Sequence, residues 1–259
     1  MRGASNRVRA DSLLVARGLA ASPAQAQALI MAGEVTTPDR RIDKPGALLA
    51  LDAPIAVAPR ARFVSRGGDK LDFALGALDV RAHGRVCLDV GASTGGFTDC
   101  LLQRGAARVY AVDVGYGQLA DKLRKDPRVD VRERVNARDL KPEDFSPRPE
   151  LVVVDASFIG LGKLMGAIAG VLPPGGELVA LVKPQFEAGR EAASRGRGVI
   201  RDEETRLAAI AEARAAVEAA GFTVIAEIDS AVHGPMGNVE RFVHARRAPP
   251  PIRADAAPP

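Results

Sequence analysis

The sequence predicts an α/β protein, in which a Rossmann-like, mostly parallel sheet of seven strands follows a smaller α+β unit. From residue 67 onward, short apolar runs alternate with helix-like segments at the spacing of βαβ units. Several runs, such as 151–154 and 178–182, are apolar throughout, as expected of strands that helices cover on both faces. Before residue 59 the pattern is different, with two helical segments followed by short strands.

The N-terminal unit is expected to span residues 1–58. Apolar residues recur at helical spacing over 9–17 and 23–32, and Ser22 and Pro23 are suited to open the second helix. Gly18 and Gly33 are typical helix stops. Short β-like pieces follow around 34–36 and 49–57, and residues 59–66 are predicted to form a linker.

The second unit is expected to span residues 67–245. Its strands are predicted near 85–90, 108–113, 128–132, 151–155, 177–183, 222–228 and 239–244. A helix over 202–220 should end at Gly221. The tail, 246–259, is rich in Pro and Ala and is predicted to be disordered.

Charge is distributed unevenly along the chain. Residues 1–70 contain eleven Lys and Arg but six Asp and Glu, a net charge of +5, whereas the rest of the chain carries −1. This asymmetry favours a polyanionic partner, with a solvated basic surface as the alternative. The Arg-rich stretch 189–201 has two equal interpretations, a mobile flap over that partner or a solvated loop.

Composition argues against several other classes. No apolar run is long enough to cross a bilayer, and the N-terminus lacks the apolar segment of a signal peptide, so we expect a cytoplasmic protein without a membrane partner. Cys87 and Cys100 are interpreted as buried small residues. The three histidines show no metal-ligand spacing, so no metal site is expected.

A glycine-rich loop at 89–97 (DVGASTGGF) follows a predicted strand and precedes a helix. Its G-x-x-x-G-G spacing differs from the G-x-G-x-x-G of dinucleotide sites, which disfavours NAD and FAD. S-adenosylmethionine fits better, because its carboxylate, ammonium and ribose can meet the helix N-terminus, Asp89 and Asp113 respectively. The predicted cofactor residues are Asp89, Gly91, Ser93, Gly95, Gly96, Phe97, Asp113 and Asp155.

Four charged residues are expected at the carboxyl edge of the sheet. Asp155 and Lys183 end their strands, Lys70 precedes the first strand, and Glu240 opens the seventh strand, which reaches this edge if it runs antiparallel. The predicted reaction is in-line attack of a hydroxyl on a sulfonium methyl group. Lysine is mostly protonated at neutral pH, so Lys183 is either a base in an altered environment or a group that orients the hydroxyl, with Lys70 holding ribose or phosphate.

The chain resembles the TlyA family of haemolysin-like ribosomal RNA 2′-O-methyltransferases, and more distantly the FtsJ-type ribose methyltransferases. The matching segments are 9–15 (RADSLLV), 28–35 (ALIMAGEV), 63–70 (FVSRGGDK), 89–97 (DVGASTGGF), 155–159 (DASFI), 183–187 (KPQFE) and 234–240 (GPMGNVE). The resemblance implies a catalytic tetrad of Lys70, Asp155, Lys183 and Glu240, with S-adenosylmethionine as cofactor and cytidine in ribosomal RNA or ribosomal subunits as substrate.

The same resemblance implies that the N-terminal unit is an RNA-binding domain of the kind first seen in ribosomal protein S-four. The expected RNA-binding residues are Arg7, Arg9, Arg17, Arg40, Arg41, Lys44 and Arg66. The sequence departs from such domains at residues 35–40 (VTTPDR), where they often have Val-Asn-Gly, but Arg40, Arg41 and Lys44 still offer phosphate contacts near this turn.

Three other functions would each need different sequence features. A non-catalytic ribosome-assembly factor needs neither the tetrad nor the glycine loop, a pore-forming haemolysin needs an amphipathic or apolar membrane segment, and a nicotinamide-dependent dehydrogenase needs a different glycine spacing. A monomer is the simplest expectation for the oligomeric state.

Overall fold

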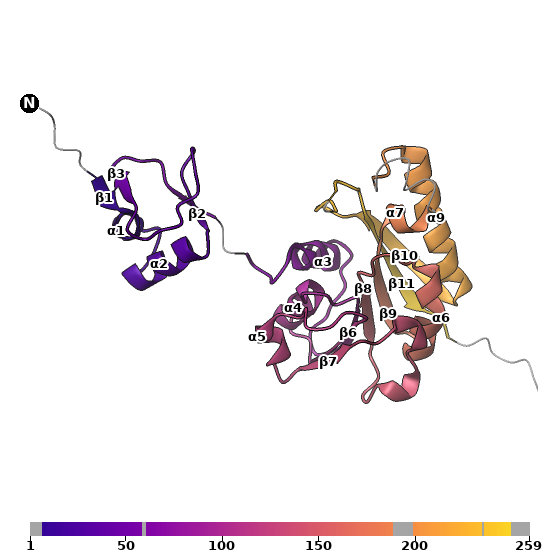
Figure 1. Cartoon of the computed structure of the whole chain (residues 1–259). Coiled ribbons are helices and arrows are strands. Elements are labelled where there is room, and N and C mark those ends of the chain that lie inside the picture. The colour runs from indigo at the N-terminus through magenta and orange to yellow at the C-terminus, as the bar shows by residue number, and fades with distance from the viewer. Residues whose placement is uncertain (1–6, 59–60, 189–198, 235, 250–259) are drawn as a thin grey trace, which may run out of the picture. The chain divides into compact units, whose positions relative to one another are not determined.

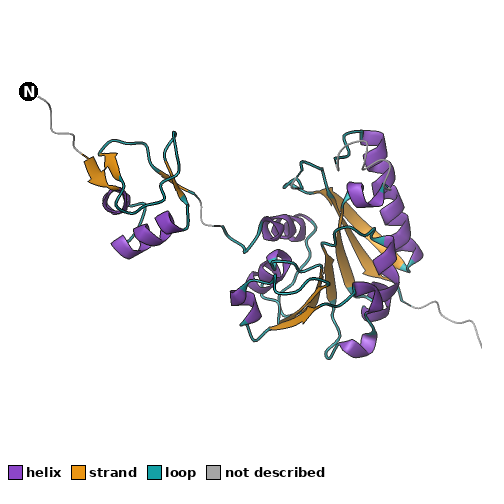
Figure 2. Cartoon of the chain, in the orientation of Figure 1, coloured by secondary structure: helices purple, strands orange, loops and turns teal. Residues whose placement is uncertain are grey.

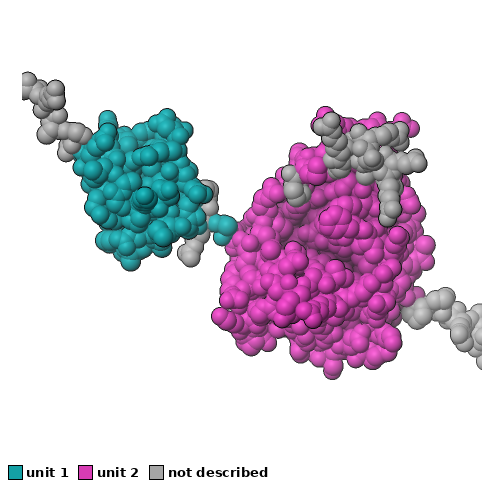
Figure 3. Space-filling view, viewed as in Figure 1, with its two compact units in different colours: residues 1–61 teal, residues 62–259 magenta. Residues whose placement is uncertain are grey.

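The computed structural model describes residues 7–58, 61–188, 199–234 and 236–249. It divides into two compact units, Met1–Ala61 and Arg62–Pro259, which Figure 3 colours separately. The expected linker at 59–66 is therefore too long, because residues 62–66 are part of the second unit. Phe63 is buried in the core of that unit, and the backbone N–H of Val64 donates a hydrogen bond to Asp99 Oδ2 at 2.9 Å.

Over residues 7–58 the first unit has two helices and four short strands: β1 (Arg7–Arg9), α1 (Ala10–Ala16), α2 (Pro23–Met31), β2 (Val35–Thr36), β3 (Leu48–Ala50) and β4 (Ala56–Val57). Both predicted helices are confirmed, and Ser22 Oγ accepts a hydrogen bond from the backbone of Gln25 at 3.2 Å, as an N-cap residue does. Strand β1, which the sequence did not predict, pairs antiparallel with β3, and β2 pairs antiparallel with β4. Leu13, Leu14 and Ile30 are central to its core.

The second unit is built on one seven-stranded sheet, and all seven predicted strands are present. They are β5 (Val86–Val90), β6 (Arg108–Asp113), β7 (Val129–Glu133), β8 (Leu151–Val154), β9 (Glu177–Val182), β10 (Phe222–Asp229) and β11 (Arg241–Arg247). Their order is β10-β11-β9-β8-β5-β6-β7. The pairs from β9 to β7 are parallel, whereas β11 runs antiparallel to β9 and to β10.

Helices cover both faces of this sheet (Figures 1 and 2). On one face lie α3 (Arg66–Ala77), α4 (Gly96–Gln103) and α5 (Asp121–Arg124), and on the other lie α6 (Gly162–Val171), α7 (Pro184–Glu187) and α9 (Glu203–Ala219). Because side chains alternate along a strand, Leu151 and Val153 pack in the core on the α3 and α4 side of the sheet. Val152 and Val154 pack in the core on the α6 and α9 side. This explains why the central strands are apolar throughout.

Several boundaries differ from the sequence-based prediction. Helix α3 was not predicted, because its Gly67, Gly68 and charged residues hide the helical pattern. The tail was predicted to start at 246, but β11 continues to Arg247: Arg246 pairs with both β9 and β10, and Arg247 pairs with Phe222 of β10. Residues 250–259 and 189–198 lie outside the described residues. Both cysteines are buried and free, as predicted. Among the described residues, no helix has the length and apolarity to cross a membrane.

Candidate active site

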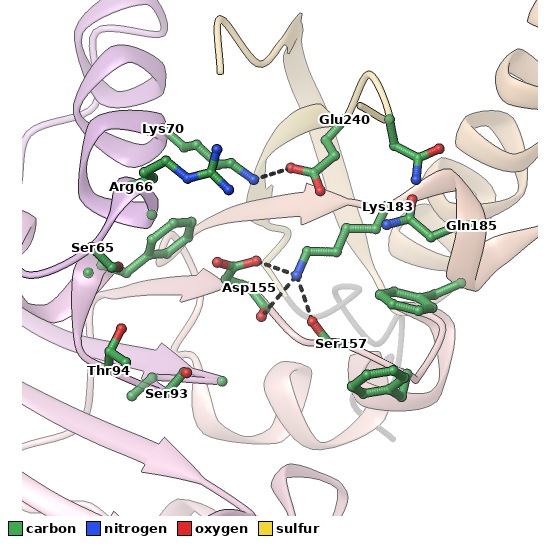
Figure 4. Close-up of a pocket in the computed structure, with 18 of the residues that line it drawn as sticks. Ser65, Arg66, Lys70, Ser93, Thr94, Asp155, Ser157, Lys183, Gln185 and Glu240 are labelled. Carbon is green, nitrogen blue, oxygen red and sulfur yellow. Dashed lines mark hydrogen bonds and ion pairs between the residues drawn. The ribbon is translucent and has the colours of Figure 1, made fainter. Parts of the chain in front are cut away.

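An open cavity of about 610 Å³ lies at the carboxyl ends of β5, β8 and β9, where ligands bind in sheets of this kind. All four residues of the predicted tetrad line it (Figure 4). Lys70 comes from the first turns of α3, Asp155 directly follows β8, Lys183 directly follows β9, and Glu240 directly precedes β11. Glu240 reaches this edge because β11 is antiparallel to β9, as the sequence argument required.

Lys70 and Glu240 form a buried ion pair. Lys70 Nζ lies 2.5 Å from Glu240 Oε2, and the two side chains are 9% and 1% exposed. The backbone N–H of Ser230 donates a hydrogen bond to the backbone carbonyl of Glu240 at 2.8 Å. This bond fixes the backbone of Glu240 at the base of the loop between β10 and β11. Burial excludes most of the solvent from this pair, so each charge depends on the other.

Lys183 and Asp155 form the second ion pair. Lys183 Nζ lies 2.6 Å from Asp155 Oδ1, donates a hydrogen bond to Ser157 Oγ at 2.9 Å, and reaches the carbonyl of Asp155 at 3.4 Å (Figure 4). The Lys183 side chain is 10% exposed. Two cations and two carboxylates thus converge on one cavity, and each lysine contacts a different carboxylate.

The glycine-rich loop forms an adjoining wall of this cavity. Of the predicted cofactor residues in this loop, Gly91, Ser93, Gly96 and Phe97 line the cavity. Gly95 is the N-cap of α4 with φ of +97°, a conformation that favours glycine. A Cβ on Gly96 would lie 2.2 Å from Ser65 Oγ and 2.8 Å from the backbone nitrogen of Gly68, so glycine lets the start of α3 pack directly on the first turn of α4.

A second cavity, of about 470 Å³, shares Gly91, Ser93 and Asp155 with the first. Asp113 lies on its wall at the end of β6. The backbone N–H groups of Ser93 and Gly115 donate hydrogen bonds to its two carboxylate oxygens, each at 2.7 Å. Each oxygen of a carboxylate accepts about two hydrogen bonds, so Asp113 keeps acceptor capacity for the hydroxyls of a ribose.

Asp89, like Gly95, is placed differently from the other predicted cofactor residues, which line one or both cavities. It lines neither cavity and is fully buried beneath the loop, where its Oδ2 accepts a hydrogen bond from Thr98 Oγ1 at 2.7 Å. Burial, together with the nearby carboxylates of Asp155 and Asp113, raises the pKa of Asp89 to about 7. In this structure Asp89 therefore anchors α4 to β5 rather than contacting the cavity directly.

The model of the FtsJ-like methyltransferase family matches residues 63–247, which contain the whole sheet and both cavities. The chain belongs to the FtsJ-like methyltransferase family. It is 44% identical over 244 residues to the Mycobacterium tuberculosis 16S/23S rRNA (cytidine-2′-O)-methyltransferase TlyA, covering 93% of this chain and 91% of that one. A Bacillus subtilis protein that carries an rRNA methyltransferase name, YqxC, is 44% identical over 242 residues, with 93% and 86% covered.

A solved structure named as a haemolysin, from Streptococcus thermophilus, matches with a TM-score of 0.72 and 40% identity over 95% of this chain and 90% of that one. These findings confirm the predicted fold class, the family resemblance and the assignment as an enzyme, a methyltransferase. They do not assign roles to individual residues, so the site is argued from its geometry.

Two predicted RNA-binding arginines of this methyltransferase already have partners within the first unit. Arg17 donates hydrogen bonds to the carbonyls of Leu51 and Ala53, each at 2.6 Å, and Arg9 pairs with Asp11 at 2.6 Å. Arg17 thus joins α1 to the segment after β3, a structural role that the sequence did not suggest. The other predicted residues, Arg7, Arg40, Arg41, Lys44 and Arg66, are exposed, and Arg66 lines the larger cavity.

Some cavity residues were quoted as parts of motifs but received no role from the sequence. They come from the loops after β8 and β9 and before β11: Ser157, Phe158, Gln185, Phe186, Met236 and Asn238. Their closeness in sequence to the tetrad could have identified them, since each lies within a few residues of a tetrad member. Among the described residues, no group of acidic residues, histidines or cysteines has the arrangement of a metal site.

Proposed function

We propose that this FtsJ-like methyltransferase transfers a methyl group from S-adenosylmethionine to a ribose 2′-hydroxyl of ribosomal RNA, with cytidine as the modified nucleoside. The relatives' names supply the substrate class, and one observation supports the chemistry. One buried lysine–carboxylate pair and one partly buried pair face the same cavity as the glycine-rich loop. A site of this kind holds a hydroxyl and a methyl donor in line, which is the main requirement of the reaction.

The residues of both cavities fit S-adenosylmethionine. Asp113 would accept hydrogen bonds from the cofactor's ribose in the smaller cavity, and the loop at the N-terminus of α4 would face its carboxylate. Gly91, Ser93 and Asp155 line both cavities, so they suit the middle of an extended ligand. When bound, the cofactor supplies a methyl group activated by its sulfonium charge.

The tetrad positions the acceptor. Lys183 keeps three acceptors around its ammonium group, which supports the orienting role over the base role considered from the sequence. With the cofactor bound, the 2′-oxygen would take the methyl group as the carbon–sulfur bond breaks, and the hydroxyl proton would pass to solvent after transfer. Lys70, held by Glu240, would bind ribose or phosphate oxygens on the other side of the cavity.

The first unit would supply RNA affinity as a domain of the S-four type. Its exposed Arg7, Arg40, Arg41 and Lys44 would provide phosphate contacts, and Arg66 of the second unit, which lines the larger cavity, would provide a separate one. We propose ribosomal subunits or free ribosomal RNA as the partner, a cytoplasmic location, and action as a monomer.

The test is transfer of radiolabelled methyl from S-adenosylmethionine to ribosomal subunits and to naked ribosomal RNA, followed by mapping of the modified ribose. Lys183→Ala should abolish transfer while cofactor binding, measured by calorimetry, remains. Lys125→Ala is the matched control, because Lys125 is the exposed C-cap residue of α5 and its side chain is 77% accessible. Cofactor binding without transfer to any RNA by the unaltered protein would contradict the proposal.

A further inference from the structure

Ser157 lies at the centre of the contacts that hold Lys183. A lysine ammonium has three N–H donors. Here the three acceptors nearest to it are Asp155 Oδ1 at 2.6 Å, Ser157 Oγ at 2.9 Å and the carbonyl of Asp155 at 3.4 Å. All three belong to the short segment that follows β8, so this segment alone determines the direction of the Lys183 side chain (Figure 4).

The Ser157 hydroxyl also faces the substrate space. Ser157 is exposed and lines both cavities. The Ser157 oxygen accepts a hydrogen bond from the Lys183 ammonium, so the hydroxyl proton of Ser157 is free to point elsewhere. Among the described residues, Lys183 is the one hydrogen-bond partner of this hydroxyl. Its remaining donor is therefore available to an oxygen in the cavity.

The backbone next to Ser157 is strained. Phe158 has φ of +66°, an uncommon conformation for a bulky residue. Such strain costs on the order of 1–3 kcal/mol and is found mostly where function needs a particular geometry. At this position the turn keeps Ser157 against Lys183 instead of letting the chain continue smoothly from β8.

We propose that Ser157 is a positioning residue for methyl transfer, an inference that rests on the proposed function. Its oxygen accepts a hydrogen bond from the Lys183 ammonium, and its O–H donates a hydrogen bond to an oxygen of the acceptor ribose. The serine thus links the lysine to the ribose and fixes the angle at which the 2′-hydroxyl meets the methyl group. Without it, one N–H of the buried ammonium loses its acceptor and the ribose loses one contact.

The test compares Ser157→Ala with Ser157→Thr, which keeps the hydroxyl, in the methyl-transfer assay with ribosomal subunits. Ser157→Ala should lower kcat about 10- to 100-fold, the effect of removing a hydrogen bond to a charged group. The KM for RNA and the Kd for S-adenosylmethionine should change by less than about threefold, and Ser157→Thr should restore most of kcat. Thr223→Ala removes an exposed hydroxyl of β10 that lines neither cavity, and should leave kcat unchanged.

A second measurement does not depend on activity. The ¹H–¹⁵N signal of the Lys183 ammonium, identified by its loss in Lys183→Arg, should be sharp in the unaltered protein and broadened by faster exchange in Ser157→Ala. Normal kcat in Ser157→Ala, or an unchanged ammonium signal, would overturn the assignment of Ser157 alone. Absence of methyl transfer by the unaltered protein would instead overturn the proposed function together with it.

Discussion

Removing one partner of the Lys70–Glu240 pair should destabilise the second unit far more than removing both. In Lys70→Met the Glu240 carboxylate, 1% exposed, would have no cation, and in Glu240→Gln the Lys70 ammonium would have no carboxylate. Breaking a buried pair from one side costs about 3–5 kcal/mol, whereas replacing both charges with neutral groups is often close to neutral. The free energy of unfolding of the double variant should therefore lie within about 2 kcal/mol of that of the unaltered protein.

The assay is urea unfolding followed by circular dichroism at a wavelength that reports helix, since the chain has no Trp for fluorescence. The unaltered protein, the two single variants and the double variant form a double-mutant cycle. The sum of the two single losses in the free energy of unfolding should exceed the loss in the double variant by at least about 2 kcal/mol. Lys125→Met is the control: its pair with Asp121 is 77% and 85% exposed, so the change should cost less than about 0.5 kcal/mol.

Two results would refute this reasoning. One is a Lys70→Met variant no less stable than Lys125→Met, which would mean that solvent reaches Glu240 and screens its charge. The other is simple additivity across the cycle, which would mean that the two charges do not depend on one another for their stabilisation.

Three further predictions follow from particular contacts. Burial raises the pKa of Asp89 to about 7, above its unfolded value, so the folded chain binds an extra proton and stability should fall as pH rises from about 4 to 7. Between pH 5 and pH 8 the fall in the free energy of unfolding should be about 3 kcal/mol, and Asp89→Asn should remove it. Arg17→Ala should lower the melting temperature of the first unit, whereas Arg41→Ala should leave it unchanged and reduce the salt dependence of RNA binding by about one phosphate contact. Gly95→Ala should destabilise the second unit by at least about 1 kcal/mol and weaken cofactor binding in calorimetry, because φ is +97° and a Cβ would lie 2.2 Å from Leu123 Cδ1; an unchanged unfolding midpoint would contradict this.

The sheet was predictable because its strands are either apolar throughout or end at charged residues. The same feature located the site, since Asp155 and Lys183 each follow a buried strand and the sheet brings those ends together. Glu240 required one further assumption, an antiparallel last strand, which the structure confirms. Fold and tetrad placement thus depend on continuous apolar runs and the charged residues that end them, both of which local sequence carries.

The remaining features depend on tertiary contacts that no local pattern encodes. Helix α3 has glycines where a helix is normally disfavoured, and it forms because Leu71 and Leu75 are buried against the sheet. Arg17 looked like a phosphate ligand, but its partners are carbonyls more than thirty residues away. Ser157 could be placed beside Lys183 only once the distance between two strand ends was known.

The direct packing of α3 on the first turn of α4, through Gly96, makes Lys70 and the glycine loop parts of one rigid body. A ligand that orders the loop must then also order the lysine that faces the acceptor. Binding free energies coupled in this way are reciprocal: if the methyl donor raises the affinity for RNA by some factor, RNA raises the affinity for the donor by the same factor. The two substrates of this enzyme should consequently favour each other's retention, and the demethylated donor should leave more slowly while the RNA is still in place.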